Sequence, residues 1–258
     1  MGMFDKKFCD ICGGKIGVLG NRKLDDGNLC KDCAKGLSPF FSDRRRSTIA
    51  DIKEQLAYRE ENKVAVAAFH TTRTLGTGTK VLLDEDAGKF MVTSARKLEE
   101  ENPDVLDFSQ VTGCNVDISE SRKELMQKDK EGKDISYKPP RYVHEYDFHM
   151  MIHVNTPWFD EIKFRLNSST IRVEPSTGLG GILNQRGADV GRGSAVFREC
   201  ETMAEEIQAA LTQVRETVRE NIAAASAPKQ AQSCPSCGAT TMPDAQGRCE
   251  YCGGAMVV

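Results

Sequence analysis

The sequence predicts an α+β fold in which two small four-Cys modules, one near each end, flank a larger antiparallel β domain that closes with a long helix. Two observations predict it. Eight of the ten cysteines form four Cys-x-x-Cys pairs, and the segment between them alternates apolar and polar residues before a stretch of helical spacing. The expected divisions are a four-Cys module at 1–42, a connecting helix at 43–63, the β domain with its helix at 64–224, a flexible linker at 225–233 and a second four-Cys module at 234–258.

The cysteine pairs have the spacing of two tetrahedral metal sites. Between the pairs lie 17 residues in the N-terminal module and 11 in the C-terminal module. Modules this small bury too little apolar surface to fold alone, and metal binding contributes on the order of 10 kcal/mol or more to such domains. We therefore expect two zinc ribbons, each with one structural zinc ion. The expected ligands are Cys9, Cys12, Cys30, Cys33, Cys234, Cys237, Cys249 and Cys252.

The residue after each pair supports this interpretation, because a small residue there lets backbone N–H groups point at the sulfurs. Gly13, Gly238 and Gly253 occupy that position, and Ala34 is the exception. Iron is an alternative metal, since Cys-x-x-Cys-Gly pairs also occur in rubredoxin-like electron carriers. A redox-active dithiol is a further alternative. Four Cys ligands leave no position for water, so catalytic zinc is not expected.

Composition and charge narrow the class of protein. The longest apolar run, Val64–Phe69, is far shorter than the roughly 20 residues that cross a bilayer. Residues 1–10 contain no apolar signal core, and Lys6 stands where a myristoylation signal requires Ser or Thr. We expect a cytoplasmic protein, in which paired cysteines bind metal more often than they form disulfides. The remaining Cys114 and Cys200 are expected to be buried thiols.

The net charge of −3 conceals a basic N-terminal region. Residues 1–46 carry ten Lys or Arg against six Asp. The run Arg44–Arg46 is expected to be a solvated linker, with a contact to nucleic acid or acidic lipid as the alternative. A helix is then expected to begin at Thr48, which forms a capping-box pattern with Asp51.

From Val64 onward the pattern has period two, which predicts strands. The expected strands are Val64–Thr72, Thr79–Leu83, Phe90–Thr93, Leu106–Ile118, Tyr142–Val154 and Phe159–Leu166. Turns are expected at Gly76–Gly78 and Asp84–Gly88. Matching the apolar faces of the last two strands predicts their register. The expected cross-strand pairs are Ile152 with Ile162, His153 with Glu161 and His149 with Arg165.

The polar face of the strand Tyr142–Val154 carries Glu145, Asp147, His149 and His153. A metal site or proton relay is one interpretation, and an enzyme using Glu145, His149 and His153 would follow from it. A half-solvated antiparallel strand shows the same alternation, and this solvated face is what we expect. His144, on the apolar side, is expected to be a hydrogen-bonded core or rim residue.

Two inserts and a helix complete the β domain. The charged segment Glu120–Arg141 is expected to form a protruding loop or hairpin arm, and the glycine-rich segment Ser176–Ser194 a flexible loop. A helix is expected from about Phe197 to Ala224, with apolar residues spaced by threes and fours. At roughly 40 Å it is longer than a small sheet can cover, so its end is expected to project or to pair with another copy of the chain.

The chain resembles an uncharacterised bacterial family with an N-terminal zinc ribbon. The motifs that carry the resemblance are Cys9-Asp-Ile-Cys12-Gly-Gly, Leu29-Cys-Lys-Asp-Cys33, the helix start Arg44–Gln55 and Tyr137-Lys-Pro-Pro-Arg-Tyr142. Residues 64–224 also resemble a pleckstrin-homology-like barrel or sandwich, in which the final helix plugs one open end. The resemblance to the zinc-ribbon family implies zinc and two domains, but it supplies no activity that can be carried over to this chain. Asp84-Glu85-Asp86 stands where phosphoinositide-binding members carry Lys and Arg, so headgroup binding is not expected there.

These observations predict a non-enzymatic adaptor or scaffold that engages protein partners through its zinc ribbons and pleckstrin-like barrel. No nucleophile, base and orienting group occur together in a recognisable pattern. The alternative is a nucleic-acid-binding regulator that uses the basic N-terminal ribbon and Arg44 to Arg46. The aromatic residues near that basic region are Phe4, Phe8, Phe40 and Phe41. A homo-oligomer formed through the long helix is a further expectation.

Overall fold

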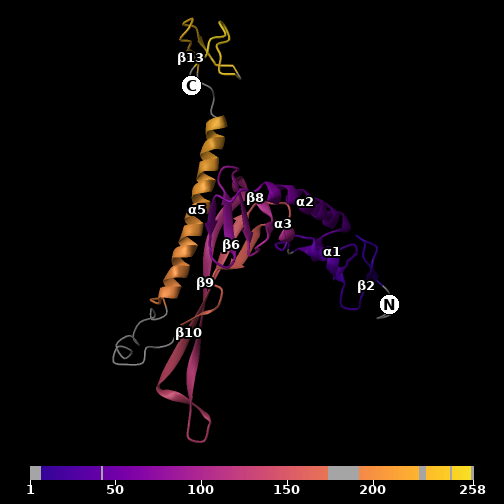
Figure 1. The fold of residues 1–258 in the computed structure, drawn as a ribbon, viewed down its shortest axis with the longest axis vertical. Helices are drawn as coiled ribbons and strands as arrows, with labels where there is room; N and C mark the ends of the chain where they lie inside the picture. Colours follow the sequence, from indigo (N-terminus) through magenta and orange to yellow (C-terminus); the bar gives the residue numbers. More distant parts are fainter. Residues whose placement is uncertain (1–6, 42, 174–191, 227–230, 245, 257–258) are drawn as a thin grey trace. The chain divides into compact units, whose positions relative to one another are not determined.

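Residues 7–41, 43–173, 192–226, 231–244 and 246–256 are described by the structure, which is a computed structural model (Figure 1). Contacts divide the chain into two units, Met1–Arg215 and Glu216–Val258. Most of the predicted loop Ser176–Ser194 and part of the predicted linker lie outside the described residues.

The first unit begins with two short hairpins and a helix that enclose the first four cysteines. The elements are β1 (Lys7–Phe8), β2 (Lys15–Ile16), β3 (Arg22–Lys23), β4 (Asn28–Leu29), α1 (Lys31–Lys35) and the 3-10 turn η1 (Arg44–Arg46). Strand β1 pairs with β2, and β3 pairs with β4. Buried apolar residues from this segment pack with Ile52 of the next helix. The N-terminal module is therefore completed by the helix that follows it.

That helix is α2 (Ile49–Ala68), and its start is as predicted. The Asp51 N–H donates to the Thr48 hydroxyl at 3.2 Å, and the Thr48 N–H donates to the Asp51 carboxylate at 2.7 Å. The predicted strand Val64–Thr72 is wrong, because α2 continues to Ala68. Its buried positions are Ile52, Gln55, Arg59, Asn62 and Val66, which follow helical spacing. Three of these five residues are polar, so apolar periodicity does not reveal the helix.

The first sheet has the strand order β5-β6-β7-β8 and is antiparallel throughout. Its strands are β5 (Arg73–Leu75), β6 (Lys80–Asp84), β7 (Lys89–Thr93) and β8 (Val105–Asp107), with α3 (Leu98–Glu101) before β8. The predicted turn after Asp84 is present. The buried Asp84 carboxylate accepts the N–H groups of His70 at 2.9 Å and Ala87 at 3.0 Å, so this acidic residue stabilises the turn itself.

The predicted continuous strand Leu106–Ile118 is wrong, because the chain changes sheets within it. Strand β8 ends at Asp107, and the 3-10 turn η2 (Phe108–Gln110) follows. The Phe108 side chain is buried against Phe90, with ring centroids 6.3 Å apart. The second sheet then begins. Its strands are β9 (Val111–Lys128), β10 (Asp134–Val154), β11 (Glu161–Arg165) and β12 (Ile171–Val173).

Strand β10 is the centre of the second sheet. It pairs with β9 along one edge and with β11 and β12 along the other. The predicted register is confirmed: His149, Ile152 and His153 lie opposite Arg165, Ile162 and Glu161. The apolar face of β10 provides the largest buried side chains of the sheet, which are Tyr146, Phe148, Met150 and Ile152. Over the described residues the two four-stranded sheets share no strand, and the expected closed barrel is not found.

The segment Glu120–Arg141 forms a hairpin arm, as predicted. Figure 1 shows β9 and β10 continuing as a two-stranded ribbon beyond the rest of their sheet, and the turn closes between Asp129 and Lys133. The pairing shifts between Ser136 and Arg141, around the two prolines. Because proline has no N–H to donate, it interrupts the ladder where its nitrogen faces the partner strand.

Helix α5 (Ala195–Ser226) packs on the second sheet, and it starts and ends close to the prediction. The Phe197 ring meets Tyr146 edge-on at 5.0 Å and Phe148 at 4.9 Å between centroids. Gln208 donates to the Cys114 carbonyl at 3.3 Å, and Arg215 donates to the Thr112 carbonyl at 2.7 Å. No helix within the described ranges has both the length and the apolar character needed to cross a membrane.

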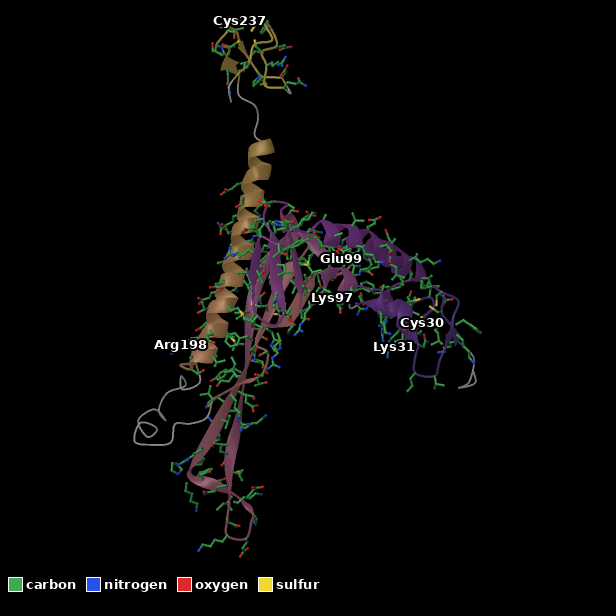
Figure 2. All side chains as sticks on the ribbon, in the orientation of Figure 1. Cys30, Lys31, Lys97, Glu99, Arg198 and Cys237 are labelled. Atoms are coloured by element: carbon green, nitrogen blue, oxygen red, sulfur yellow. The ribbon has the colours of Figure 1, made fainter. Side chains whose placement is uncertain are left out.

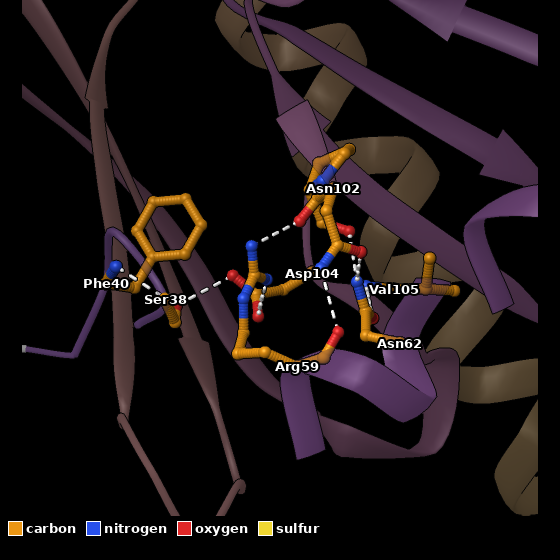
Figure 3. Close-up of polar contacts among 8 residues, drawn as sticks. Ser38, Phe40, Arg59, Asn62, Asn102, Asp104 and Val105 are labelled. Atoms are coloured by element: carbon orange, nitrogen blue, oxygen red, sulfur yellow. Dashed lines mark hydrogen bonds and ion pairs between the residues drawn. The ribbon is translucent and has the colours of Figure 1, made fainter. Parts of the chain in front are cut away.

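A buried polar network joins the N-terminal module, α2 and the segment before β8 (Figure 3). The Arg59 guanidinium donates to the Asp104 carboxylate at 2.8 Å, and the Ser38 hydroxyl donates to its other oxygen at 2.7 Å. Asn62 donates to the Pro103 carbonyl at 2.8 Å and accepts the Val105 N–H at 2.9 Å. Burial raises the pKa of Asp104, and the charge of Arg59 acts against that rise.

Aromatic contacts reinforce the same junction. Phe41 meets Trp158 at 6.4 Å between ring centroids, and Phe40 meets Phe159 at 5.5 Å. The ring of Tyr58 in α2 also lies 6.4 Å from that of Trp158. The segment that leaves the N-terminal module therefore packs on the β10–β11 loop, and α2 packs there as well.

Replacing Asp104 by Ala should lower the free energy of unfolding by about 3–5 kcal/mol, because the buried charge of Arg59 would lose its counter-charge. The matched control is Glu60→Gln, which removes an exposed ion pair with Lys63 and should cost less than about 1 kcal/mol. Urea unfolding followed by the fluorescence of Trp158, the single tryptophan, measures both. Equal losses in the two variants would contradict the importance of the buried pair.

Candidate metal centres

The first four-Cys group lies between a turn and a helix start. Cys9 and Cys12 belong to the turn after β1, while Cys30 and Cys33 lie at the beginning of α1. Their four sulfur atoms lie within 4.8 Å of one another, and the Cys12 and Cys30 sulfurs are 3.8 Å apart. Zinc–sulfur bonds of about 2.3 Å in a tetrahedron place sulfurs about 3.8 Å apart, so the group fits one such ion.

Backbone geometry explains why the N-terminal pairs differ in sequence. The Gly13 N–H donates to the Cys9 carbonyl at 2.8 Å, and Gly13 has φ +70°, which favours glycine. The second pair begins α1, where Cys30 is the N-cap and its sulfur accepts the Cys33 N–H at 3.3 Å. Ala34 is helical there and needs no positive φ. Ala34 therefore stands where the other pairs have Gly because a helix, and not a second turn, follows Cys33.

The second four-Cys group is built from two matching turns. It follows β13 (Gln232–Ser233) and includes β14 (Thr240–Thr241). Sulfur separations are 3.5 Å between Cys234 and Cys252 and 3.7 Å between Cys237 and Cys249. After these two pairs come Gly238 with φ +72° and Gly253 with φ +69°. Figure 2 labels one cysteine of each group, Cys30 and Cys237.

The electrostatics of the first group favour at least one thiolate. Burial acts to raise the pKa of Cys9, but the N–H groups of Cys12, Cys30 and Ile11 lower it to about 6. Burial and the neighbouring thiols raise the pKa of Cys33 well above its ordinary value. Four thiolates at this spacing repel one another unless a cation neutralises them. The donor set therefore suits a divalent ion that prefers sulfur.

The second group shows the same division between its cysteines. The backbone N–H of Cys237 lowers the pKa of Cys234 to about 6. For Cys252, the Gly254 N–H acts to lower the pKa, but the thiols of Cys237 and Cys234 raise it to about 12. Each group thus contains one Cys whose pKa is lowered and one whose pKa is raised.

In the part of the chain that the structure describes, these are the only gatherings of His, Cys, Asp or Glu side chains close enough to share one ion. Cys200 is buried and Cys114 is half-buried, and burial raises the pKa of both thiols.

The polar face of β10 makes cross-strand contacts. Glu145 pairs with Lys123 at 2.6 Å, and a His153 ring nitrogen lies 2.8 Å from the Asn115 side-chain oxygen.

His144 also lies where the sequence suggested, with its Nδ1 atom 3.0 Å from the Glu120 carboxylate. The hydroxyl of Tyr146 donates to the same carboxylate at 3.2 Å. His144 is therefore a hydrogen-bonded residue at the rim of the sheet, and its neighbours in β9 and β10 account for its position.

Comparison with known proteins identifies one segment. Residues 7–55 match a family described as "Domain of unknown function (DUF4428)". The DUF4428 segment contains the first four-Cys group, η1 and the start of α2. Ile52, near its end, packs in the same cluster as Cys9, so the segment corresponds to the N-terminal module and the part of α2 that completes its core. No curated protein and no solved structure matches the chain.

Metal analysis should find two zinc ions per chain, and the purified protein should show no visible absorption. Cys30→Ser and Cys234→Ser should each reduce the content to one ion, because each removes one of four ligands from a different group. Cys114→Ser is the matched control and should keep both ions, since Cys114 belongs to neither group. Mass spectrometry for metals and an absorption spectrum provide the readouts. A red protein that contains iron would contradict the assignment of zinc. An unchanged number of bound ions in Cys30→Ser would contradict the assignment of Cys30 as a ligand.

Proposed function

We propose that this chain is a non-enzymatic adaptor, in which zinc stabilises two small modules that engage protein partners. The observation that carries the proposal is the composition of the two metal groups. All eight sulfur donors come from Cys, four in each group. A zinc ion with four protein ligands has no position for water or substrate, which is the arrangement of structural sites.

The contacts of the ionisable side chains on β10 also support a role without catalysis. Glu145 and His153 are engaged across the sheet by Lys123 and Asn115. Asp147 forms an ion pair with Arg165 and also contacts Asn167. Through these contacts the ionisable groups on the polar face of β10 bond to neighbouring side chains of the sheet. A solvated, ion-paired strand face accounts for them.

The remaining architecture supplies surfaces for partners. Two antiparallel sheets followed by a helix that packs on one of them support a pleckstrin-homology-like sandwich as the scaffold. The β9–β10 arm offers a further surface. We place the protein in the cytoplasm, where reduced thiols are available to metal. The same proposal includes five parts: an N-terminal module, a connecting helix that ends at Ala68, a β domain with its helix, a linker and a C-terminal module.

The nucleic-acid alternative retains its basic residues but loses part of its aromatic support. Phe40 packs against Phe159 and Phe41 packs against Trp158. Single-strand binding needs aromatic faces open to bases. These two rings are engaged within the chain, so a protein partner is the better candidate.

A cross-linking pull-down compares the intact chain with Cys30→Ser and Cys234→Ser, using Cys114→Ser as the control. Cys30→Ser and Cys234→Ser should each lose a different set of captured proteins, because each metal ion stabilises a separate module. Capture should survive nuclease treatment and stay nearly constant as salt rises from about 50 to 200 mM, since nucleic-acid binding falls steeply over that range.

Two outcomes would contradict the proposal. Capture that disappears with nuclease would indicate a nucleic-acid partner. Capture unchanged by either cluster substitution, in variants that have lost a metal ion, would show that the metal modules do not engage partners.

A further inference from the structure

The turn between β2 and β3 presents two adjacent apolar side chains to solvent. The Gly20 N–H donates to the Gly17 carbonyl at 3.0 Å, which places Val18 and Leu19 at the two central positions of the turn. Val18 is 96% exposed and Leu19 is 91% exposed. Such positions favour Gly, Pro, Asn, Asp or Ser. A single exposed apolar side chain is ordinary, but two at one turn tip add nothing to the core and indicate a contact outside the chain.

A cationic hollow adjoins this turn. Its volume is about 610 Å³, and it forms where η1 lies against β3. The residues that line it are Asn21, Arg22, Lys23, Leu24, Asp25, Arg44 and Arg45. The Arg22 guanidinium donates to the Leu19 carbonyl at 3.5 Å, so the apolar turn and the hollow share a boundary.

The hollow has an excess of positive charge. Four cations line it, and Asp25 is the one carboxylate among its lining residues. Across the described residues, none of these four cations forms an ion pair, whereas Arg46 next to them pairs with Asp43. Burial, followed by the charges of Arg22 and Arg45, lowers the pKa of Arg44. The crowded cations therefore favour an anionic ligand.

We propose that the β2–β3 turn and the adjoining hollow bind an anionic lipid bilayer. Val18 and Leu19 enter the interfacial region, and the four cations contact lipid phosphates. A soluble phosphate would engage the cations but leave both apolar side chains in water. A bilayer accounts for both features, because its interface buries apolar groups directly beside a layer of phosphate. The proposal goes beyond the adaptor function and does not depend on it.

The two metal modules differ in the segment that carries this surface. The N-terminal module has 17 residues between its Cys pairs and the C-terminal module has 11. The β2–β3 turn lies within the longer segment, between Cys12 and Cys30. Metal binding at these cysteines would hold both ends of the segment and so fix the turn beside the hollow.

Vesicle co-sedimentation of the full-length chain tests the site. We expect binding to vesicles of phosphatidylcholine mixed with phosphatidylglycerol, and none to phosphatidylcholine alone. Val18→Ser combined with Leu19→Ser should lower the partition coefficient at least about tenfold. Lys23→Gln combined with Arg45→Gln should lower it about 30-fold. All four side chains are exposed, so the variants should keep their fold and metal content.

Each pair has a matched control elsewhere in the chain. Val64→Ser removes an apolar side chain that is 73% exposed on α2, and Lys130→Gln with Lys133→Gln removes two charges at the tip of the arm. Both controls should bind as the unmodified chain does. Absent binding to mixed vesicles, or equal losses in variants and controls, would overturn the proposal. Vesicle binding could instead depend on the cations alone. If binding persists after the Val18 and Leu19 changes, and inorganic phosphate or an oligonucleotide displaces the vesicles, the hollow binds a soluble polyanion. That result would also overturn the bilayer proposal.

Discussion

The buried ion pair between Arg59 and Asp104 is the interaction on which the first unit depends. Neither charge is solvated, so each requires the other and the hydrogen bonds around them. Those bonds come from distant parts of the chain. Ser38, in the segment that leaves the N-terminal module, donates to Asp104, and the carbonyl of Asn102, before β8, accepts from Arg59. If any of these segments moved away, a polar or charged group would stay buried without its hydrogen-bond partner. These hydrogen bonds and the ion pair therefore hold the N-terminal module, α2 and the first sheet together.

Local rules in the sequence predicted the two four-Cys groups and the centre of the second sheet. Each Cys-x-x-Cys pair lies within four residues, and two such pairs in one short segment indicate a ligand set, so both groups were recognisable without the fold. The β10–β11 register was equally accessible, because a shift of one residue would turn Ile152 toward solvent. The start of α2 was visible in Thr48 and Asp51 for the same reason. Each of these features depends on residues close together in the sequence.

The errors arose where distant residues decide the structure. Helix α2 buries Arg59 and Asn62 because their partners lie near β8, and no local pattern reveals those partners. The change of sheet at Phe108 depends on burial beside Phe90. Phe40 and Phe41 lie near the basic region in the sequence, but their rings pack against residues of the β10–β11 loop. The helix at Cys30 was missed too, although Ala34 in place of glycine was a signal.

The outer edge of β9 has a consequence for how separate molecules behave together. In the described part of the chain no strand pairs with this edge, and an open edge can add a strand from another molecule. Near α5, the side chains of Arg215 and Gln208 donate to the carbonyls of Thr112 and Cys114. Farther out, the strand carries the charged run 122–124. Both the bonded carbonyls and the charged side chains reduce the tendency of this open edge to pair with a strand of another molecule.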